Sequence, residues 1–392
     1  MKRIRNVIIA GAGAVIPWGA MTTNKLTNLL KLDTVFINDK GERIGQYLFD
    51  LLKQNSQTKN EPNFETILNF IEAIYQFKSN KKKLISEKYS LRSSFQITDF
   101  CHLDEEIISK LFSFEEKNPH IKKELYDLVY LLNTAIGQNR KIHGYLFYME
   151  LYTHFVFLII EKIKAYDKKS NLDNYFKLNE RFNGFFSRLK QNSGLIRYYT
   201  LNYDLLPFKI FNGFFDGYNN IGEIDIEGIV KGKFKDVYYN LHGSIMMDFN
   251  GHKTGYINSS STPSTFENNQ LIPSPIITGY NKLDRLFEKS YFHFYNKLIY
   301  DCYNADNIYI IGYSFGDKHI NAAINAAMQI GKTKITIIDK IDINNENSRR
   351  GFMNNYKRLA PTQDYSINKM EPLSTKLQLY LNSFEEYLKE HF

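Results

Sequence analysis

The sequence predicts an α/β fold in which a Rossmann-like parallel sheet is flanked by helices and carries a large helical insertion. Short apolar, β-branched runs that end at turn residues are typical of parallel strands buried on both faces. Between the first and second of these runs, apolar residues recur every three or four positions, as they do in helices. The predicted strands are residues 6–10, 195–201, 237–241, 307–311 and 334–339.

The long stretch between the first two predicted strands is expected to form a helical insertion beside the sheet. We therefore predict a sheet domain from residues 1–60 and 193–360, an insertion at residues 61–192 and a helical tail at residues 361–392. In the tail, residues 375–392 have the pattern of an amphipathic helix, which could cap the fold or join subunits. The helix-period patterns of the insertion cover residues 63–77, 105–114, 122–132, 145–165 and 174–190.

Bulk composition excludes several classes of protein. Hydrophobic residues make up 43% and aromatic residues 15% of the 392 residues, which excludes disordered and fibrous chains. No run reaches the ~18 apolar residues of a membrane span, and the N-terminus lacks a signal-peptide pattern. Two cysteines, Cys101 and Cys302, cannot form a disulfide framework or a four-thiolate zinc site, so we expect a cytoplasmic protein without a metal. The net charge of +8 is spread along the chain, which favours a mildly basic surface over a dedicated nucleic-acid site.

The first candidate site is the turn Gly11-Ala12-Gly13-Ala14, which follows the first predicted strand and precedes a predicted helix. Glycines in such a turn let the backbone approach a pyrophosphate, and amides at a helix start attract its negative charge. Ile16 stands where the third glycine of the G-x-G-x-x-G pattern would be. A plain strand-to-loop turn is therefore the alternative.

Two further candidate sites follow the second and third predicted strands. Thr200, Asn202 and Asp204 belong to the sequence TLNYD, in which an amide and a carboxylate two residues apart could hold a sugar hydroxyl and a water. The alternative is a capping turn, because Asp204 also suits the start of the next helix and Asn202 suits a turn. His242, in LHGS, has an ordinary pKa of ~6.5 and is a natural proton acceptor, although a lone histidine is as often structural.

The fourth and fifth predicted strands also end in candidate residues. The turn GYSFGD, residues 312–317, could approach a nucleotide, with Ser314 donating to a phosphate or ribose. It also fits the G-x-S-x-G pattern of a hydrolase nucleophile elbow, but the later histidines, His319 and His391, give a poor triad order. Asp339 closes the strand ITIID, where it could accept hydrogen bonds from ribose hydroxyls or remain a solvated carboxylate.

Taken in order, these motifs resemble the sirtuin-like NAD⁺-binding family, and in particular its bacterial members without a zinc module. The matching segments are GAGA at residue 11, NFETIL at 63, TLNYD at 200, LHGS at 241 and IIGYSFGDKHIN at 310. Deacylating sirtuins carry zinc on two cysteine pairs, which this sequence lacks. The resemblance therefore implies a relative other than a typical protein deacetylase.

The resemblance implies that NAD⁺ is the substrate and that no metal is needed. It makes Asn202 and His242 the catalytic residues, with Asn202 orienting a water and His242 acting as general base. It also places Asn202 and Asp204 beside the nicotinamide ribose. The positions expected to bind NAD⁺ are Gly11, Ala12, Gly13, Ala14, Thr200, Asp204, Gly312, Ser314, Asp317 and Asp339.

Bacterial relatives of this kind are commonly NAD⁺ hydrolases of anti-phage defence, which deplete NAD⁺ once they are activated. The resemblance implies a homo-oligomeric hydrolase that yields ADP-ribose and nicotinamide, with a HerA-like ATPase, an Argonaute protein or a phage component as activator. The alternatives are a non-catalytic module that senses NAD⁺ or ADP-ribose, and a protein ADP-ribosyltransferase or deacylase.

Overall fold

The computed structural model divides into two compact units. One comprises Met1–Ala20, Ile163–Ile245 and Leu286–Phe392, and the other Met21–Lys162 and Met246–Arg285. These divisions differ from the domain boundaries expected at residues 60, 192 and 360, which stay a prediction. The described residues are 3–36, 42–54, 61–79, 144–169, 175–232, 235–248, 252–253, 274–278, 291–330, 332–342, 344–359 and 377–392.

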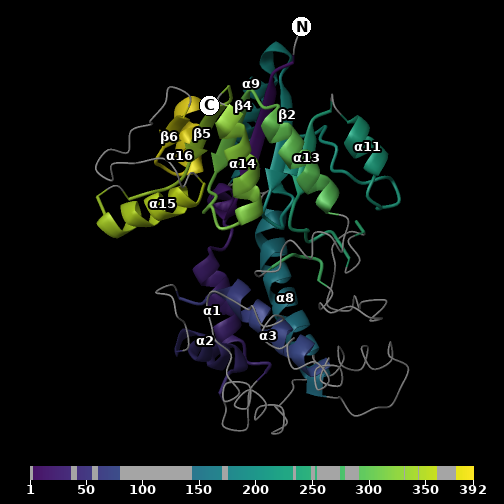
Figure 1. Cartoon of the computed structure of the whole chain (residues 1–392), viewed down its shortest axis with the longest axis vertical. Helices are drawn as coiled ribbons and strands as arrows, with labels where there is room; N and C mark the ends of the chain where they lie inside the picture. The colour runs from purple at the N-terminus through teal and green to yellow at the C-terminus, as the bar shows by residue number, and fades with distance from the viewer. Residues whose placement is uncertain are drawn as a thin grey trace. The chain divides into compact units, whose positions relative to one another are not determined.

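The first unit is built on a six-stranded parallel sheet flanked by helices (Figure 1). The strand order is β3-β2-β1-β4-β5-β6, and every neighbouring pair is parallel. This order reverses between β1 and β4, which is where open α/β sheets bind their ligands. The predicted Rossmann-like fold is confirmed. The strands are β1 (Arg5–Ala10), β2 (Leu195–Thr200), β3 (Val237–Asn240), β4 (Asn307–Ile311), β5 (Lys334–Ile338) and β6 (Leu377–Tyr380).

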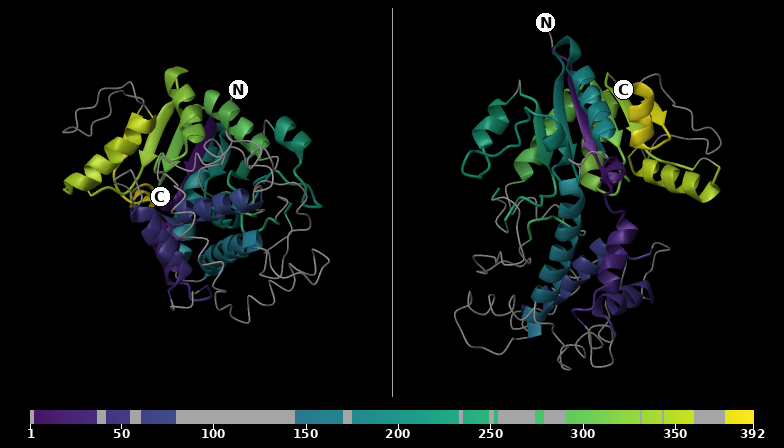
Figure 2. Two further views of the ribbon diagram at one scale, coloured as in Figure 1. Left: turned by 60° about the horizontal axis from the view of Figure 1, so that its bottom comes forward. Right: turned by 180° about the vertical axis from the view of Figure 1, so that it is seen from behind.

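Helices cover both faces of this sheet. Successive strand residues point to opposite faces. On β2, Tyr198 packs edge-on against Phe186 of α9, whereas the hydroxyl of Tyr199 donates to Asp301 of α13 at 2.6 Å. Figure 2 shows the strands and helices from two further directions. Among its described residues, this unit contains the end of α8 (Gly144–Lys169) from Ile163 and the helices α9 (Phe176–Lys190), α10 (Leu206–Ile210), α11 (Ile226–Lys231), α13 (Phe292–Tyr303), α14 (Lys318–Ile330), α15 (Glu346–Leu359) and α16 (Phe384–His391).

The sixth strand corrects the prediction of a helical tail with one helix over residues 375–392. Leu377–Tyr380 pairs with β5, and within the described residues 377–392 the helix is limited to Phe384–His391. The helix begins there because the hydroxyl of Ser383 accepts a hydrogen bond from the amide of Glu386 at 3.2 Å, which caps its first turn. The short run LQLY alternates apolar and polar residues, and its backbone hydrogen bonds are made to a strand far away in the sequence.

The second unit contains α1 (Thr23–Leu32), α2 (Ile44–Gln54), α3 (Phe64–Ser79) and α8 (Gly144–Lys169) as far as Lys162. The helices predicted at residues 63–77 and 145–165 are confirmed by α3 and α8, and that at 174–190 by α9 of the first unit. The helices predicted at 105–114 and 122–132 lie outside the described residues.

The NFETIL segment begins α3 with a reciprocal cap. The side-chain oxygen of Asn63 accepts from the amide of Thr66 at 3.0 Å, and the hydroxyl of Thr66 accepts from the amide of Asn63 at 3.3 Å. Two amides that a helix start leaves without partners are satisfied in this way. A structural role therefore accounts for this segment.

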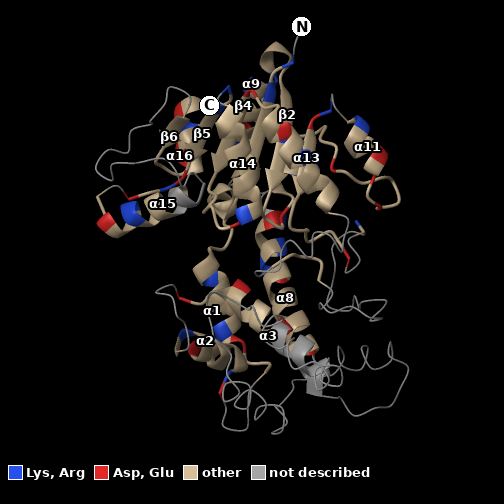
Figure 3. Ribbon diagram, viewed as in Figure 1, with Lys and Arg blue, Asp and Glu red and all other residues tan. Residues whose placement is uncertain are grey.

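Charges are interspersed on the described helices. Figure 3 shows basic and acidic residues together on α11, α15 and α16. Within the described residues, no helix is long and apolar enough to cross a membrane.

Candidate functional site

The turns that follow β1 to β5 lie in one row at the carboxyl edge of the sheet. The register aligns Ala10 with Thr200 and Ile311, Thr200 with Asn240, and Ile311 with Ile338. The predicted catalytic and NAD⁺-binding residues all lie in these turns or at the strand ends that lead into them, so they share one edge of one unit. Backbone hydrogen bonds of 2.9 Å extend the row from Leu241 to Thr200, Leu201 to Ala10, Gly11 to Ile311 and Gly312 to Ile338.

At the centre of this row, the turns after β1 and β4 pack backbone to backbone. A Cβ on Gly11 would lie 2.5 Å from the carbonyl oxygen of Gly312, and a Cβ on Gly13 would lie 2.7 Å from the Cα of Gly312. Gly312 has a φ of +56°, a left-handed conformation that favours glycine. The contact between the two turns therefore requires all three glycines, whether or not a pyrophosphate binds there.

Most amides of the GAGA turn are used inside the protein. The amide of Gly13 donates to Gly312 and that of Ala14 donates to Gly11, each at 3.0 Å. Ala12 is exposed, and its amide has no acceptor among the described residues. Ala12 is thus the position of this turn whose amide can bond a ligand phosphate.

Asn202 is held beside this turn by three hydrogen bonds. Its side-chain amide nitrogen donates to the carbonyl oxygen of Gly11 at 2.9 Å, and its backbone amide donates to the hydroxyl of Thr200 at 3.0 Å. Asn240 donates to its carbonyl oxygen at 3.1 Å. The Oδ1 atom of Asn202 accepts no hydrogen bond from the described part of the chain. It can therefore accept one from a water or a sugar hydroxyl, whereas the buried Thr200 positions the turn.

Asp204 is used inside the protein through both carboxylate oxygens. One accepts from the hydroxyl of Tyr166 at 2.8 Å, and the other accepts from the amide of Leu206 at 3.1 Å. Burial, together with the charge of Asp167, raises the pKa of Asp204 to about 6. This geometry gives Asp204 a structural role in the turn before α10 in place of the expected ribose contact, but the N-cap of α10 is Leu205 and not Asp204.

His242 lies beside a second histidine, His319, which from the sequence was a candidate only for a hydrolase triad. The His242 and His319 side chains are both buried, and their ring centroids are 5.9 Å apart. Tyr295 packs edge-on against His319 at 5.4 Å, and its hydroxyl donates to the carbonyl oxygen of His319 at 3.1 Å. The signal in the sequence is the position of His319 in the first turn of α14, because that turn starts at the same edge of the sheet.

The GYSFGD turn is braced by its own Tyr313 and by Asn321 of α14. The hydroxyl of Tyr313 accepts from the amide of Asp317 at 3.1 Å, and the side chain of Asn321 donates to the carbonyl oxygen of Phe315 at 2.9 Å. These bonds hold Phe315 at a left-handed φ of +56° and leave Ser314 exposed. The turn can therefore present the Ser314 hydroxyl to a ligand.

Asp339 continues the row beyond Gly312. Its amide donates to the carbonyl oxygen of Tyr380 at 3.1 Å, and its side chain is partly buried. Burial raises the pKa of its carboxyl to about 6, against a backbone hydrogen bond from Lys340. This carboxyl lies at the edge where a ribose contact was expected, beside the strand that the sequence did not predict.

Two further observations concern what this edge of the sheet could bind. Within the described residues, no three His, Cys, Asp or Glu side chains are grouped as a metal would require. A cavity of about 650 Å³ in the same unit is lined by none of the residues predicted to act on or bind NAD⁺.

Residues 196–358 match the SIR2-like domain family. The match runs from β2 into α15, covers less than half of the chain, and begins after the GAGA turn. No curated protein matches the chain. The match supports the sirtuin-like resemblance and indicates an activity related to NAD⁺.

Proposed function

We propose that this chain is an NAD⁺ glycohydrolase that cleaves the bond between nicotinamide and ribose. The observation that carries the proposal is the placement of Asn202 and His242 at the ends of the neighbouring strands β2 and β3. They lie on the sheet edge where β1 and β4 bring their glycine turns together. The SIR2-like match over this region supports it.

The proposed reaction adds water to C1′ of the nicotinamide ribose. The C1′–N bond breaks and its electron pair passes to the nicotinamide nitrogen, which neutralises the pyridinium. The oxygen of water bonds to C1′, and His242 takes the proton that water releases. The products are nicotinamide, ADP-ribose and one proton.

The protein would contribute orientation and charge stabilisation. Because its amide nitrogen is fixed to Gly11 at 2.9 Å, Asn202 presents Oδ1 to the water in one orientation. The exposed Ala12 amide and the Ser314 hydroxyl would bind the pyrophosphate across the switch point. Such fixed groups stabilise an oxocarbenium-like ribose without reorganising during the reaction.

We also propose that the enzyme rests in a state of low turnover and acts in anti-phage defence in the cytoplasm, as a homo-oligomer. His242 is 2% exposed and Asn202 is 9% exposed, so a substrate must displace part of what covers them. This burial supports dependence on an activator. The candidates are a HerA-like ATPase, an Argonaute protein and a phage component.

The test is a product analysis with the full chain. Purified protein is incubated with NAD⁺, alone and with each candidate activator, and nicotinamide and ADP-ribose are quantified. Asn202→Ala and His242→Ala should each lower turnover by roughly 10²–10⁴-fold. The matched controls Asn344→Ala and His252→Ala, at exposed positions, should keep it.

Each of three outcomes would contradict the proposal or one of its residue assignments. Unchanged turnover in either site variant removes the assignment of that residue. Tight NAD⁺ binding without nicotinamide release under every activator would indicate a sensing module. Acyl-ADP-ribose or a labelled protein, in place of free ADP-ribose, would indicate deacylation or ADP-ribosyl transfer.

A further inference from the structure

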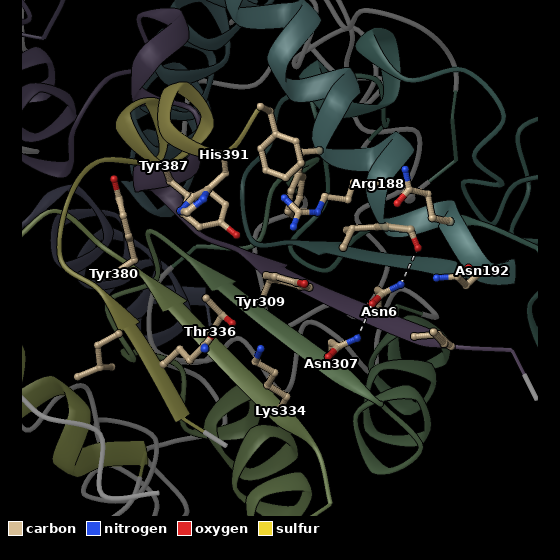
Figure 4. Close-up of a pocket in the computed structure, with 17 residues that line it drawn as sticks. Asn6, Arg188, Asn192, Asn307, Tyr309, Lys334, Thr336, Tyr380, Tyr387 and His391 are labelled. Atoms are coloured by element: carbon tan, nitrogen blue, oxygen red, sulfur yellow. Dashed lines mark hydrogen bonds between the residues drawn. The ribbon is translucent and has the colours of Figure 1, made fainter. Parts of the chain in front are cut away.

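A polar groove lies on one face of the sheet, away from the row of turns at the carboxyl edge. Its cavity of about 650 Å³ is bounded by the strands β1, β4, β5 and β6, by α9 with the residues that follow it, and by α16 (Figure 4). Strands of a parallel sheet are normally apolar because helices cover both faces. The floor of this groove instead carries Asn6, Asn307, Tyr309, Lys334 and Thr336.

The strand register places these floor residues on the same face. Asn6 is aligned with Asn307 and Asn307 with Lys334, and neighbours in a parallel ladder share a face. The amide nitrogen of Asn307 donates to Asn6 at 2.8 Å, and that of Asn6 donates to the carbonyl oxygen of Leu189 at 2.9 Å. The floor is therefore a fixed polar surface that is tied to the end of α9.

The charged side chains that line the groove are basic, while burial and the nearby carboxylates of Glu390 and Glu386 raise the pKa of Tyr380 in its wall. Arg188, Lys334 and His391 line it, and no Asp or Glu does. Arg188 and Lys334 are exposed and form no ion pair with the described residues. Burial raises the pKa of both Tyr309 and Tyr387, and the charge of Arg188 opposes this rise in each, which places the guanidinium near both hydroxyls. A ligand that suits this groove carries negative charge.

Aromatic rings form the remaining wall. Tyr387 and His391 lie 4.5 Å apart between ring centroids, and Tyr309 packs edge-on against Phe185 at 5.5 Å. The guanidinium of Arg188 lies 5.5 Å from the ring of Phe392. Flat rings of this kind stack on planar heterocycles. The volume is within the ~300–1,000 Å³ that is usual for small-molecule sites.

We propose that this groove is a binding site for a mononucleotide, separate from the edge where NAD⁺ is expected to react. Arg188 and Lys334 bind its phosphates, and the rings of Tyr387 and His391 contact its base. Asn192, which follows α9 in a left-handed conformation at φ 54°, lines the same cavity and can bond the sugar. The proposal does not rest on NAD⁺ hydrolysis, because no residue assigned to that reaction lines the groove.

The test uses ADP as the probe with the full-length chain. Isothermal titration calorimetry measures the affinity for ADP, adenosine and pyrophosphate, and hydrogen exchange read by mass spectrometry locates the bound ADP. We expect ADP to bind at least tenfold more tightly than adenosine or pyrophosphate, which is about 1.4 kcal/mol. We expect protection in residues 185–192 and 384–392.

Substitutions separate this site from the other edge of the sheet. Arg188→Gln and Lys334→Gln should each weaken ADP binding about tenfold or more, whereas the exposed neighbours Lys177→Gln and Lys332→Gln should not change it. Lys334 is exposed, so its variant keeps the proposal testable if Arg188→Gln fails to fold. Asn202→Ala should keep ADP binding in the groove even where NAD⁺ hydrolysis is lost.

Four results would overturn the proposal. They are no ADP binding, adenosine binding as tightly as ADP, unchanged affinity in both groove variants, and protection confined to residues 11–14 and 312–317. Failure of NAD⁺ hydrolysis alone leaves these readouts unaffected, so the two proposals fall separately.

Discussion

Gly312→Ala tests the backbone contact on which the arrangement of the carboxyl edge depends. A Cβ at this position would lie 2.3 Å from the Cα of Gly13, and the residue has a φ of +56°. A left-handed conformation costs a residue with a Cβ about 1–2 kcal/mol, and forcing a methyl group into a packed contact costs about 1–3 kcal/mol. The free energy of unfolding should therefore fall by about 2–5 kcal/mol.

The assay is thermal unfolding of the full chain, with Gly316→Ala as the matched control. A loss of this size lowers the Tm by roughly 4 °C or more in a domain of this size. Gly316 lies in the same turn, but a Cβ there would meet only the hydroxyl of Ser314 at 3.7 Å, an ordinary contact. Its substitution should stay within about 0.5 kcal/mol of the parent chain. Equal melting of the Gly312→Ala variant and the parent would refute the packing of the two turns.

Three further predictions concern buried polar residues. The rings of His319 and His242 lie 5.9 Å apart, so His319→Ala should lower kcat/KM for NAD⁺ by removing a group that packs beside the proposed base; unchanged kcat/KM would show that His242 is positioned without His319. Burial raises the pKa of the Asp204 carboxyl to about 6, so this carboxyl binds its proton more tightly in the folded state than in the unfolded chain. The free energy of unfolding therefore falls as the pH rises from about 4 to about 6. Asp204→Asn should weaken this fall in urea unfolding at pH 4, 5 and 6, and an unchanged slope would show that another group causes it. Asp301→Ala should lower the free energy of unfolding by about 3–5 kcal/mol in the same urea assay. The reason is that the fully buried Arg197, which lies 3.1 Å from Asp301, loses its counter-charge. A loss below about 1 kcal/mol would contradict a buried ion pair.

Much of the first unit could be predicted because its strands are buried on both faces. Val7, Ile8, Ile9 and Ala10 are fully buried, so the chain must supply an unbroken apolar run there. The edge strand Leu377–Tyr380 has no such requirement. Its partially exposed residues fit a helix pattern equally well, and only pairing with β5 decides between them.

For the candidate site, the sequence predicted which edge of the sheet carries it but not the contacts of each residue there. Strand ends can be found in a sequence, and parallel strands bring their ends together, so the convergence of residues 11, 202, 242 and 312 follows from the fold. The structural role of Asp204 did not follow from the fold, because a turn that is fixed by a carboxylate and a site that binds a sugar use the same residue type at the same kind of strand end. The structural role of Asp204 depends on a hydrogen bond from Tyr166, which lies far away in the sequence.

The mononucleotide groove could not be predicted from any short sequence motif, because its residues come together only in the folded chain. Its chemistry comes from Asn6, Arg188, Asn307, Lys334 and His391, which belong to five separate elements. Each of these side chains alone is an ordinary polar residue at a strand start or on a helix surface. Their common orientation is a property of the register and of the helices that flank the sheet, so it became visible only in three dimensions.

The contacts of Asn202 connect the packing of the glycine turns to the proposed chemistry. Asn202 is oriented by the carbonyl oxygen of Gly11, and the position of Gly11 is fixed by its contact with Gly312. A methyl group at Gly312 must push the two turns apart, and the Gly11 carbonyl would move with them. Because an error of ~1 Å in positioning can lower a rate by about 10²-fold, Gly312→Ala should lose NAD⁺ turnover even at temperatures where it remains folded. Gly316→Ala should keep its turnover, and full activity in the folded Gly312→Ala variant would show that Asn202 is oriented by something other than the glycine turn.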